Sequence, residues 1–297
     1  MHDKTLPRWL GIALLMFIAV VSGGNNIAAR FAFDHGLTVT TAVAARSAIT
    51  ALAVLLLMLA LHLPFALTGS TNKRALGIGV VLAVQSYCLY SAVARIPAAL
   101  ALLVFNLHPL MLTLLSWAAG VERPKALALG AMPVALFGLA LALDLQGSGS
   151  FPGRWGDIGA GIGFAFAAAA SFATAMFLFG RWLKGVDTRL RICLTMGTVA
   201  VVALAAGLFT DTLALPADAY AWFGLALLTL LYGAATAALF MLLPRLGSAS
   251  DIAALNFESI AVLLFAWTLL GQTLAPLQIA GMLIVVASIV ALGSGKR

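Results

Sequence analysis

Two short clusters of polar residues interrupt long apolar stretches of the sequence, and they are the first candidates for chemistry. The first contains Asn106 and His108, and the second contains Asn256, Glu258 and Ser259. Ionisable side chains are costly inside an apolar helix, so their default interpretation is a substrate site or a proton relay. Glu258 can meet an amino group or carry a proton, and His108 can meet a carboxylate or relay a proton. The simpler alternative is a protonated Glu258 that only hydrogen-bonds to a neighbouring helix.

Tyrosine and amide side chains form a second group of substrate-binding candidates. Gln85, Tyr87 and Tyr90 lie close together, and Ser86 shares a helix face with Tyr90 because the two are four residues apart. Tyr232 lies in a similar apolar stretch later in the chain. A cavity with apolar walls and a few polar groups suits an apolar or aromatic ligand. Hydrogen bonds between packed helices are the alternative role for these groups.

Four residues are predicted to serve in gating or structure. Arg46 lies roughly 12 Å inside its expected helix, where it can reach outward, bind an anionic group or satisfy carbonyls of the preceding helix. Asn25 and Asn26 are expected to link helices near an outer gate, with ligand contact as the alternative. Pro109 falls in mid-helix, where its missing N–H is expected to cause a kink.

The elements that position these residues follow from composition. Of 297 residues, 63% are hydrophobic and 9% are charged, whereas an average soluble domain has roughly 25% charged residues. This composition excludes an ordinary soluble enzyme and favours a chain that lies in lipid. The net charge of +7 does not indicate a nucleic-acid partner, since the basic residues are spread over short loops.

Ten stretches have the roughly 20 apolar residues that a membrane helix needs. They cover residues 8–30, 38–61, 75–94, 97–119, 125–144, 157–181, 190–209, 219–242, 250–270 and 276–293. The sequence therefore predicts an all-α, polytopic membrane protein. Residues 159, 163, 167, 171 and 175 are Gly, Gly, Ala, Ser and Ala, and this stripe of small side chains predicts a helix-packing face.

The distribution of basic residues predicts the orientation. Thirteen of the 17 Lys and Arg fall on the side that holds both termini, three (Arg30, Arg95 and Arg154) fall on the other side, and Arg46 lies within a helix. Because cytoplasmic loops are enriched in Lys and Arg, both termini are expected in the cytoplasm. The expected location is the cytoplasmic (inner) membrane. The six tryptophans fall near the ends of predicted spans, as in an interfacial belt.

The chain is expected to divide into two related halves, residues 1–146 and 157–297, joined by a Gly/Ser-rich external linker at 147–156. The matched positions are Arg95 with Asn106 and Arg245 with Asn256, eleven apart, and Gly120 with Gly130 and Gly271 with Gly281, ten apart. A duplicated unit of five helices must insert in the inverted orientation. Inverted repeats of this kind occur in secondary transporters, with the substrate near the midplane between halves. Under this alignment the clusters around His108 and Glu258 occupy equivalent places in opposite halves and are expected to face one another.

With these features the sequence resembles the drug/metabolite transporter superfamily, in its EamA-like branch. The residues that carry the resemblance are the Gly23-Gly24-Asn25-Asn26 run, Arg46 and the Gly120-Val121-Glu122-Arg123 segment. The second half has Gly271-Gln272-Thr273 at the equivalent place and departs from the family's ending. The resemblance implies an exporter that works by alternating access, and among relatives the bacterial amino-acid exporters are the most similar.

The expected function is therefore export of small metabolites, with apolar or aromatic amino acids as the first candidates and protons as a candidate coupling ion. Efflux of drugs or organic cations is the alternative transport function, with Glu258 as the cation's partner. An enzyme or a channel is the alternative class. The sequence contains no His-Glu-x-x-His, Gly-x-Ser-x-Gly or Walker motif, so no catalytic residue, metal site or cofactor is predicted. The partners expected are a small-molecule substrate and membrane lipids.

Overall fold

The computed structural model describes residues 8–62, 69–121, 126–142, 155–183, 186–242, 257–271 and 275–294. Within these ranges the chain is all-helical and contains no strand, which confirms the predicted all-α class. The predicted linker at 147–156 lies mostly outside the described residues.

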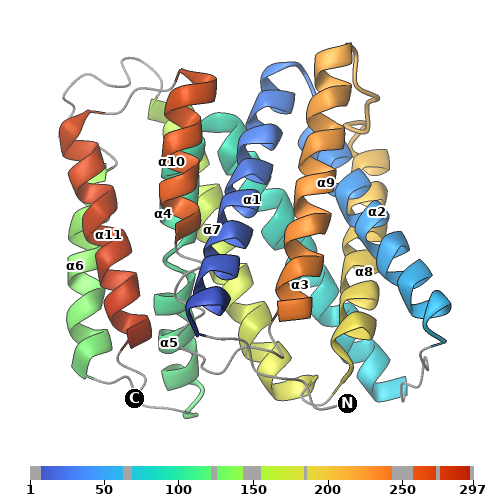
Figure 1. Cartoon of the computed structure of the whole chain (residues 1–297), viewed down its shortest axis with the longest axis horizontal. Helices are drawn as coiled ribbons and strands as arrows, with labels where there is room; N and C mark the ends of the chain where they lie inside the picture. The colour runs from blue at the N-terminus through green and yellow to red at the C-terminus, as the bar shows by residue number, and fades with distance from the viewer. Residues whose placement is uncertain are drawn as a thin grey trace.

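The helices follow one another as nearly parallel and antiparallel rods (Figure 1). They are α1 (Arg8–Asp34), α2 (Val39–Ala60), α3 (Gly69–Arg95), α4 (Ala98–Phe105), α5 (His108–Ala118), α6 (Ala126–Ala142), α7 (Trp155–Trp182), α8 (Thr188–Phe209), α9 (Ala219–Leu242), α10 (Phe257–Leu270) and α11 (Pro276–Ser294). Their bounds agree with the predicted stretches to within a few residues, except at the start of α3, which begins six residues earlier, and at α10, where 251–256 lie outside the description.

Seven helical segments of the described chain are long and apolar enough to cross a membrane. They are Trp9–Asp34, Val39–Ala60, Thr71–Arg95, Ala98–Ala118, Ile158–Trp182, Thr188–Phe209 and Ala219–Leu239. Three shorter apolar segments lie in α6, α10 and α11, at Pro133–Ala142, Ile260–Leu270 and Pro276–Ser288. The segment Ala98–Ala118 joins α4 and α5, so these two helices form one interrupted rod.

The rods pack in a regular pattern. In Figure 1, α1 stands in front between α9 and α10, α6 and α11 form one edge, and α2 and α8 form the other. The most extensive contacts join α1 to α9, α3 to α7, α2 to α8, and α6 to α11. Helix α1 also packs on α10, and α7 packs on both α4 and α5.

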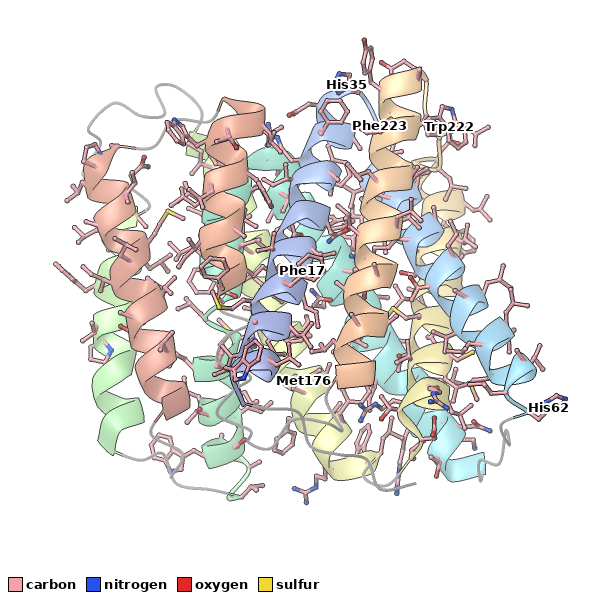
Figure 2. The ribbon with its side chains drawn as sticks, in the orientation of Figure 1. Phe17, His35, His62, Met176, Trp222 and Phe223 are labelled. Carbon is pink, nitrogen blue, oxygen red and sulfur yellow. The ribbon has the colours of Figure 1, made fainter. Side chains whose placement is uncertain are left out.

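Large apolar side chains cover much of the outer surface. Phe209 is 91% exposed and Leu215 is 81% exposed, and Phe17 and Phe223 project from α1 and α9 (Figure 2). Such a surface is unfavourable in water and favourable in hydrocarbon, because lipid tails replace the contacts that water cannot make. Trp9, Trp117, Trp182, Trp222 and Trp267 are also exposed. The chain therefore has the surface of a membrane protein.

Left-handed glycines end three helices. Gly36 follows α1 with φ +85°, Gly120 follows α5 with φ +69°, and Gly271 follows α10 with φ +62°. A residue without Cβ adopts this conformation at no steric cost, and it lets the chain turn out of the helix. After α5, for example, the N–H of Val121 donates to the carbonyl of Ser116 at 2.9 Å.

Helix α1 extends four residues beyond its predicted end because Arg30 holds its last turn. The guanidinium of Arg30 pairs with Asp34 at 3.0 Å. It also donates to the carbonyls of Val93, Ala94 and Ile96, at 2.9, 3.4 and 3.3 Å. These carbonyls lie at the C-terminal end of α3, where they have no partner within the helix. One side chain therefore joins the last turns of α1 and α3.

The predicted small-residue face of α7 is wrong in its first three positions, although Ala175 at its end is buried. Gly159, Gly163 and Ala167 are exposed, and a Cβ added at Gly159 or Gly163 would meet nothing within 4 Å. The packed face runs instead through Gly161 and Ala165. A Cβ at Gly161 would lie 2.6 Å from Cγ2 of Ile96, so this glycine is where α7 approaches the turn between α3 and α4 closely.

Candidate functional site

Helix α1 positions the candidate site because four consecutive residues of it reach different neighbours. A Cβ at Gly23 would lie 3.1 Å from Val262 of α10, and one at Gly24 would lie 3.3 Å from Leu231 of α9. The two glycines therefore let α10 and α9 approach the helix closely. The next two residues, Asn25 and Asn26, are 4% and 3% exposed and carry hydrogen bonds to two separate polar groups.

The first polar group is a buried hydrogen-bond network, here named the Arg46 network, formed by Asn25, Arg46, Gln85, Ser86 and Tyr90. Arg46 donates to Oη of Tyr90 at 2.9 Å and to Oγ of Ser86 at 3.0 Å. Tyr90 donates in turn to Oδ1 of Asn25 at 3.1 Å. The predicted common face of Ser86 and Tyr90 is thereby confirmed. Gln85 accepts a hydrogen bond from Ser86 at 3.3 Å.

Two aromatic rings cover the guanidinium of Arg46. Its Cζ lies 4.6 Å from the ring centroid of Tyr90 and 4.0 Å from that of Tyr232. A charged residue at the centre of a membrane helix costs about 2.5–3.5 kcal/mol on insertion scales. A desolvated cation–π contact returns about 2 kcal/mol. The rings therefore offset a substantial part of the cost of burying Arg46.

Arg46 does not take either of two roles that the sequence left open. It is 4% exposed, so it does not reach outward to the surface. Its two hydrogen bonds go to side-chain hydroxyls of α3, so it does not satisfy backbone carbonyls of α1. Binding of an anionic group is the one of the three roles that these contacts leave open.

The second polar group is the pair of Asn26 and Glu258. Nδ2 of Asn26 donates to Oε1 of Glu258 at 3.0 Å and to the carbonyl of Ser22 at 3.2 Å. Oδ1 of Asn26 is buried and has no partner among the described residues. Glu258 is in the first turn of α10. Of its predicted neighbours, Asn256 and the side chain of Ser259 lie outside the described residues.

His108 lies where α4 and α5 separate. In an unbroken helix the N–H of residue 109 would donate to the carbonyl of residue 105, but Pro109 has no N–H. Nδ1 of His108 instead lies 3.1 Å from the carbonyl of Phe105. Because a carbonyl can only accept, Nδ1 carries the proton in this bond. The interruption at residues 106–107 agrees with the kink expected from Pro109.

Aromatic side chains surround His108. Its ring centroid lies 5.2 Å from that of Phe105 and 4.8 Å from that of Phe172 of α7, the latter edge-on. The sequence was expected to bring His108 and Glu258 face to face. In the part of the chain that the structure describes, the ring contacts and hydrogen bonds of His108 involve α4 and α7, and those of Glu258 involve α1. No hydrogen bond or ring contact found among the described residues joins the two side chains.

The remaining predicted residues are separated by the structure. Asn106 lies at the helix interruption. Tyr87 is 42% exposed and packs edge-on against Phe164 of α7, at 6.4 Å between centroids, away from the Arg46 network. Tyr232 faces Arg46, and its hydroxyl lies 3.5 Å from the sulfur of Met196.

Sequence reasoning missed the aromatic contribution of α7 and the role of Tyr232 as a cover for Arg46. Phe164 and Phe172 are ordinary residues for a membrane helix, and no local spacing distinguishes a phenylalanine that faces lipid from one that faces another helix. The available signal for Tyr232 is its spacing from Thr229 and Thr236, three and four residues away. This spacing indicates a polar helix face, but it does not indicate which residue that face meets.

Comparisons with known proteins establish the fold alone. No protein-family model and no curated protein sequence matches the chain. A solved crystal structure matches 96% of this chain and 96% of its own, with a TM-score of 0.65 and 16% sequence identity. The helical arrangement therefore occurs in another protein that shares few identical residues with this chain.

Proposed function

We propose that this chain is a secondary transporter of the EamA-like type that exports small metabolites by alternating access. The observation that carries the proposal is that a buried cation, Arg46, and a carboxyl group, Glu258, are hydrogen-bonded to adjacent residues of one helix, Arg46 through Tyr90 and Glu258 directly. Buried ionisable groups within apolar helices are expensive, so a functional role is their default interpretation.

The packing pattern supports ten spans in two inverted halves. If α1, α2 and α3 correspond to α7, α8 and α9, then α4 with α5 corresponds to α10, and α6 to α11. When each helix is replaced by its counterpart, the α1–α9 contact becomes the α7–α3 contact, which is present. In the same way, the α1–α10 contact becomes the contact of α7 with α4 and α5, which is also present. The α2–α8 and α6–α11 contacts convert into themselves. A pseudo-two-fold axis has this effect, and the left-handed glycines Gly120 and Gly271 end corresponding helices.

The positions of the chain ends agree with the proposed orientation. The first turn of α1 and the last turn of α11 lie at the same end of the bundle (Figure 1), as an even number of crossings requires. Together with the excess of Lys and Arg on the side of the termini, this favours a cytoplasmic location for both ends in a bacterial-type inner membrane.

In this proposal, α1 is the element through which the two halves respond to substrate. Asn25 bonds to Tyr90 of the first half, and Asn26 bonds to Glu258 of the second. A rocking motion of one half against the other must alter at least one of these hydrogen bonds. A substrate amino group that competes with Asn26 for the carboxylate of Glu258 would provide the differential contact that such a change of state requires.

Amino acids with apolar or aromatic side chains are the first candidate substrates. Their amino group suits Glu258, and their side chain suits the aromatic surface formed by Phe105, His108 and Phe172. An organic cation would use Glu258 in the same way without needing a partner for a carboxylate.

Counterflow into proteoliposomes tests the proposal. Purified protein is reconstituted, loaded with unlabelled amino acid and supplied with labelled members of an amino-acid panel at two pH values. We expect saturable counterflow for at least one apolar or aromatic amino acid, and a loss of at least tenfold in Glu258→Gln. Thr268→Val, on the exposed face of the same helix, is the matched control and should retain the wild-type rate. Saturable counterflow of organic cations with none for any amino acid would overturn the amino-acid assignment, and unsaturable flux would indicate a channel.

A further inference from the structure

Arg46 is a buried cation without a counter-charge. Among the described residues no carboxylate oxygen lies within 4.0 Å of its guanidinium, since the one ion pair found there is Arg30–Asp34. Both hydrogen-bond acceptors of Arg46 are neutral hydroxyls. These hydroxyls donate their own protons to Asn25 and Gln85, so the network is polarised in one direction and places no negative charge beside the arginine.

The guanidinium also retains unused donors. A guanidinium has five N–H groups, and the hydrogen bonds to Tyr90 and Ser86 use two of them. Nε is buried and has no partner in the described part of the chain. The hydroxyl of Thr229 is also buried without a partner among the described residues. Thr229 lies one turn from Tyr232 on the same face of α9. Buried donors are normally paired, so unpaired ones indicate a missing acceptor.

Other arginines of the described chain do not share this situation. Arg30 has Asp34 and three backbone carbonyls as partners. Arg95 is exposed, donates to the carbonyl of Ser91 and stacks on Phe164. The combination of complete burial, neutral partners and a free Nε distinguishes Arg46.

We propose that Arg46 is the binding residue for a small monovalent anion, and that in transport this anion is the carboxylate of the exported substrate. This inference rests on the proposed function. Arginine suits the task because its planar fork binds a carboxylate through two parallel N–H bonds. The hydroxyls of Tyr90 and Ser86 hold two of its nitrogens, so the guanidinium is oriented before the anion arrives.

The helices around Arg46 place the proposed anion site between the two proposed halves. Arg46 comes from α2 and its two hydrogen-bond partners come from α3, while the ring of Tyr232 that covers it comes from α9. The anion would therefore be bound where helices of the two proposed halves meet.

Anion-dependent thermal stability of the purified protein tests the site without requiring transport. Acetate, chloride and a bulky sulfonate are compared at constant ionic strength. Wild-type protein should show a saturable rise in Tm with acetate, of roughly 3–5 °C, and none with the sulfonate. Arg46→Gln should abolish the rise, and Arg46→Lys should reduce it because a lysine cannot form the bidentate pair. Arg95→Gln is the matched control and should respond like wild type.

If neither acetate nor chloride changes the Tm of the wild-type protein, the proposal is overturned, whether or not the Arg46 variants fold. If chloride raises the Tm and carboxylates do not compete with chloride for the site, the carboxylate assignment is overturned. Tyr90→Phe provides a further variant, because it frees one more N–H of Arg46 without removing the charge. Its acetate response should equal or exceed that of wild type, and loss of the response would contradict the role of Arg46.

The transport assay supplies the second readout. In wild-type proteoliposomes an amino acid should inhibit counterflow at least tenfold more strongly than its amide, and Arg46→Lys should remove this preference. Saturable counterflow with an unchanged preference in Arg46→Lys would overturn the anion site and leave the transporter function standing. An acetate response that depends on Arg46, without counterflow of any amino acid, would support the anion site and refute the proposed function.

Discussion

Helices α1 and α7 occupy corresponding places in the packing, yet they contribute different chemistry. Helix α1 meets its neighbours through amides, with Asn25 bonded to Tyr90 and Asn26 bonded to Glu258. Helix α7 meets its neighbours through phenylalanines, with Phe164 against Tyr87 and Phe172 against His108. Each helix has a glycine at a close approach to a neighbour, Gly23 in α1 and Gly161 in α7.

If the two halves are repeats, as proposed above, the difference indicates how such a framework acquires an asymmetric interior. Glycines and small residues preserve the close helix contacts that hold the framework together in lipid. The side chains beside them are free to diverge, since an amide and a phenyl ring can both fill the space between packed helices. Helix α1 therefore provides directional hydrogen bonds, whereas α7 provides an apolar surface of adjustable shape.

The largest expected effect comes from removing the amide of α1. Asn26→Leu deprives Glu258 of its donor and leaves a polar group buried against an apolar one, which typically costs about 1–3 kcal/mol. We expect at least a tenfold loss of counterflow together with a lowered Tm. Both are measured on purified protein, with Asn26→Asp as the companion variant. Full activity of Asn26→Leu would show that the Asn26–Glu258 bond is dispensable.

A smaller effect is expected from the glycines of the two helices. A Cβ at Gly23 would lie 3.1 Å from Val262, whereas a Cβ at Gly163 of α7 would meet nothing within 4 Å. Gly23→Ala should therefore lower stability by about 1 kcal/mol, and Gly163→Ala should leave it unchanged or raise it by up to about 1 kcal/mol. Thermal unfolding in detergent measures both. Equal responses of the two variants would contradict the assignment of the packed faces.

The smallest effect is expected from the aromatic side. Phe172→Leu keeps an apolar side chain beside His108 and Phe105, so the fold and the maximal rate should change little. The apparent KM should change by roughly fivefold, and in opposite directions for aromatic and small apolar substrates, because a change of about one methylene in the buried apolar contact is worth about 1 kcal/mol. Concentration-dependent counterflow of two such substrates gives the measurement. A uniform change for both would place Phe172 outside the substrate surface.

Helix positions could be predicted from the sequence because lipid requires about 20 apolar residues for each crossing. The spans at 39–60 and 219–242 were predicted almost to the residue. The facing surfaces could not be predicted in the same way. A helix in lipid is apolar all round, so the Gly159–Gly163 stripe looked like a packing face although the packed residues of α7 are Gly161 and Ala165.

The sequence predicted which residues belong to the candidate site better than it predicted their hydrogen-bond partners. Ser86 with Tyr90, and the interruption near Pro109, follow from local spacing, and both are present in the structure. The partner of Glu258 was not predicted, because Asn26 is 232 residues away in the chain. Nothing in the local sequence indicates which of several buried amides will meet a given carboxyl group.

The tie formed by Arg30 has a mechanical consequence for α1. Arg30 fixes the end of α1 to the end of α3. If α1 tilts, it would therefore rotate about that fixed end. Asn26 lies roughly 6 Å from the pivot and the start of the helix roughly 33 Å away. A tilt of about 10° would then move Asn26 by roughly 1 Å and the start of α1 by roughly 6 Å. An adjustment the size of one hydrogen bond at Glu258 would be amplified into an opening at the far end of the bundle.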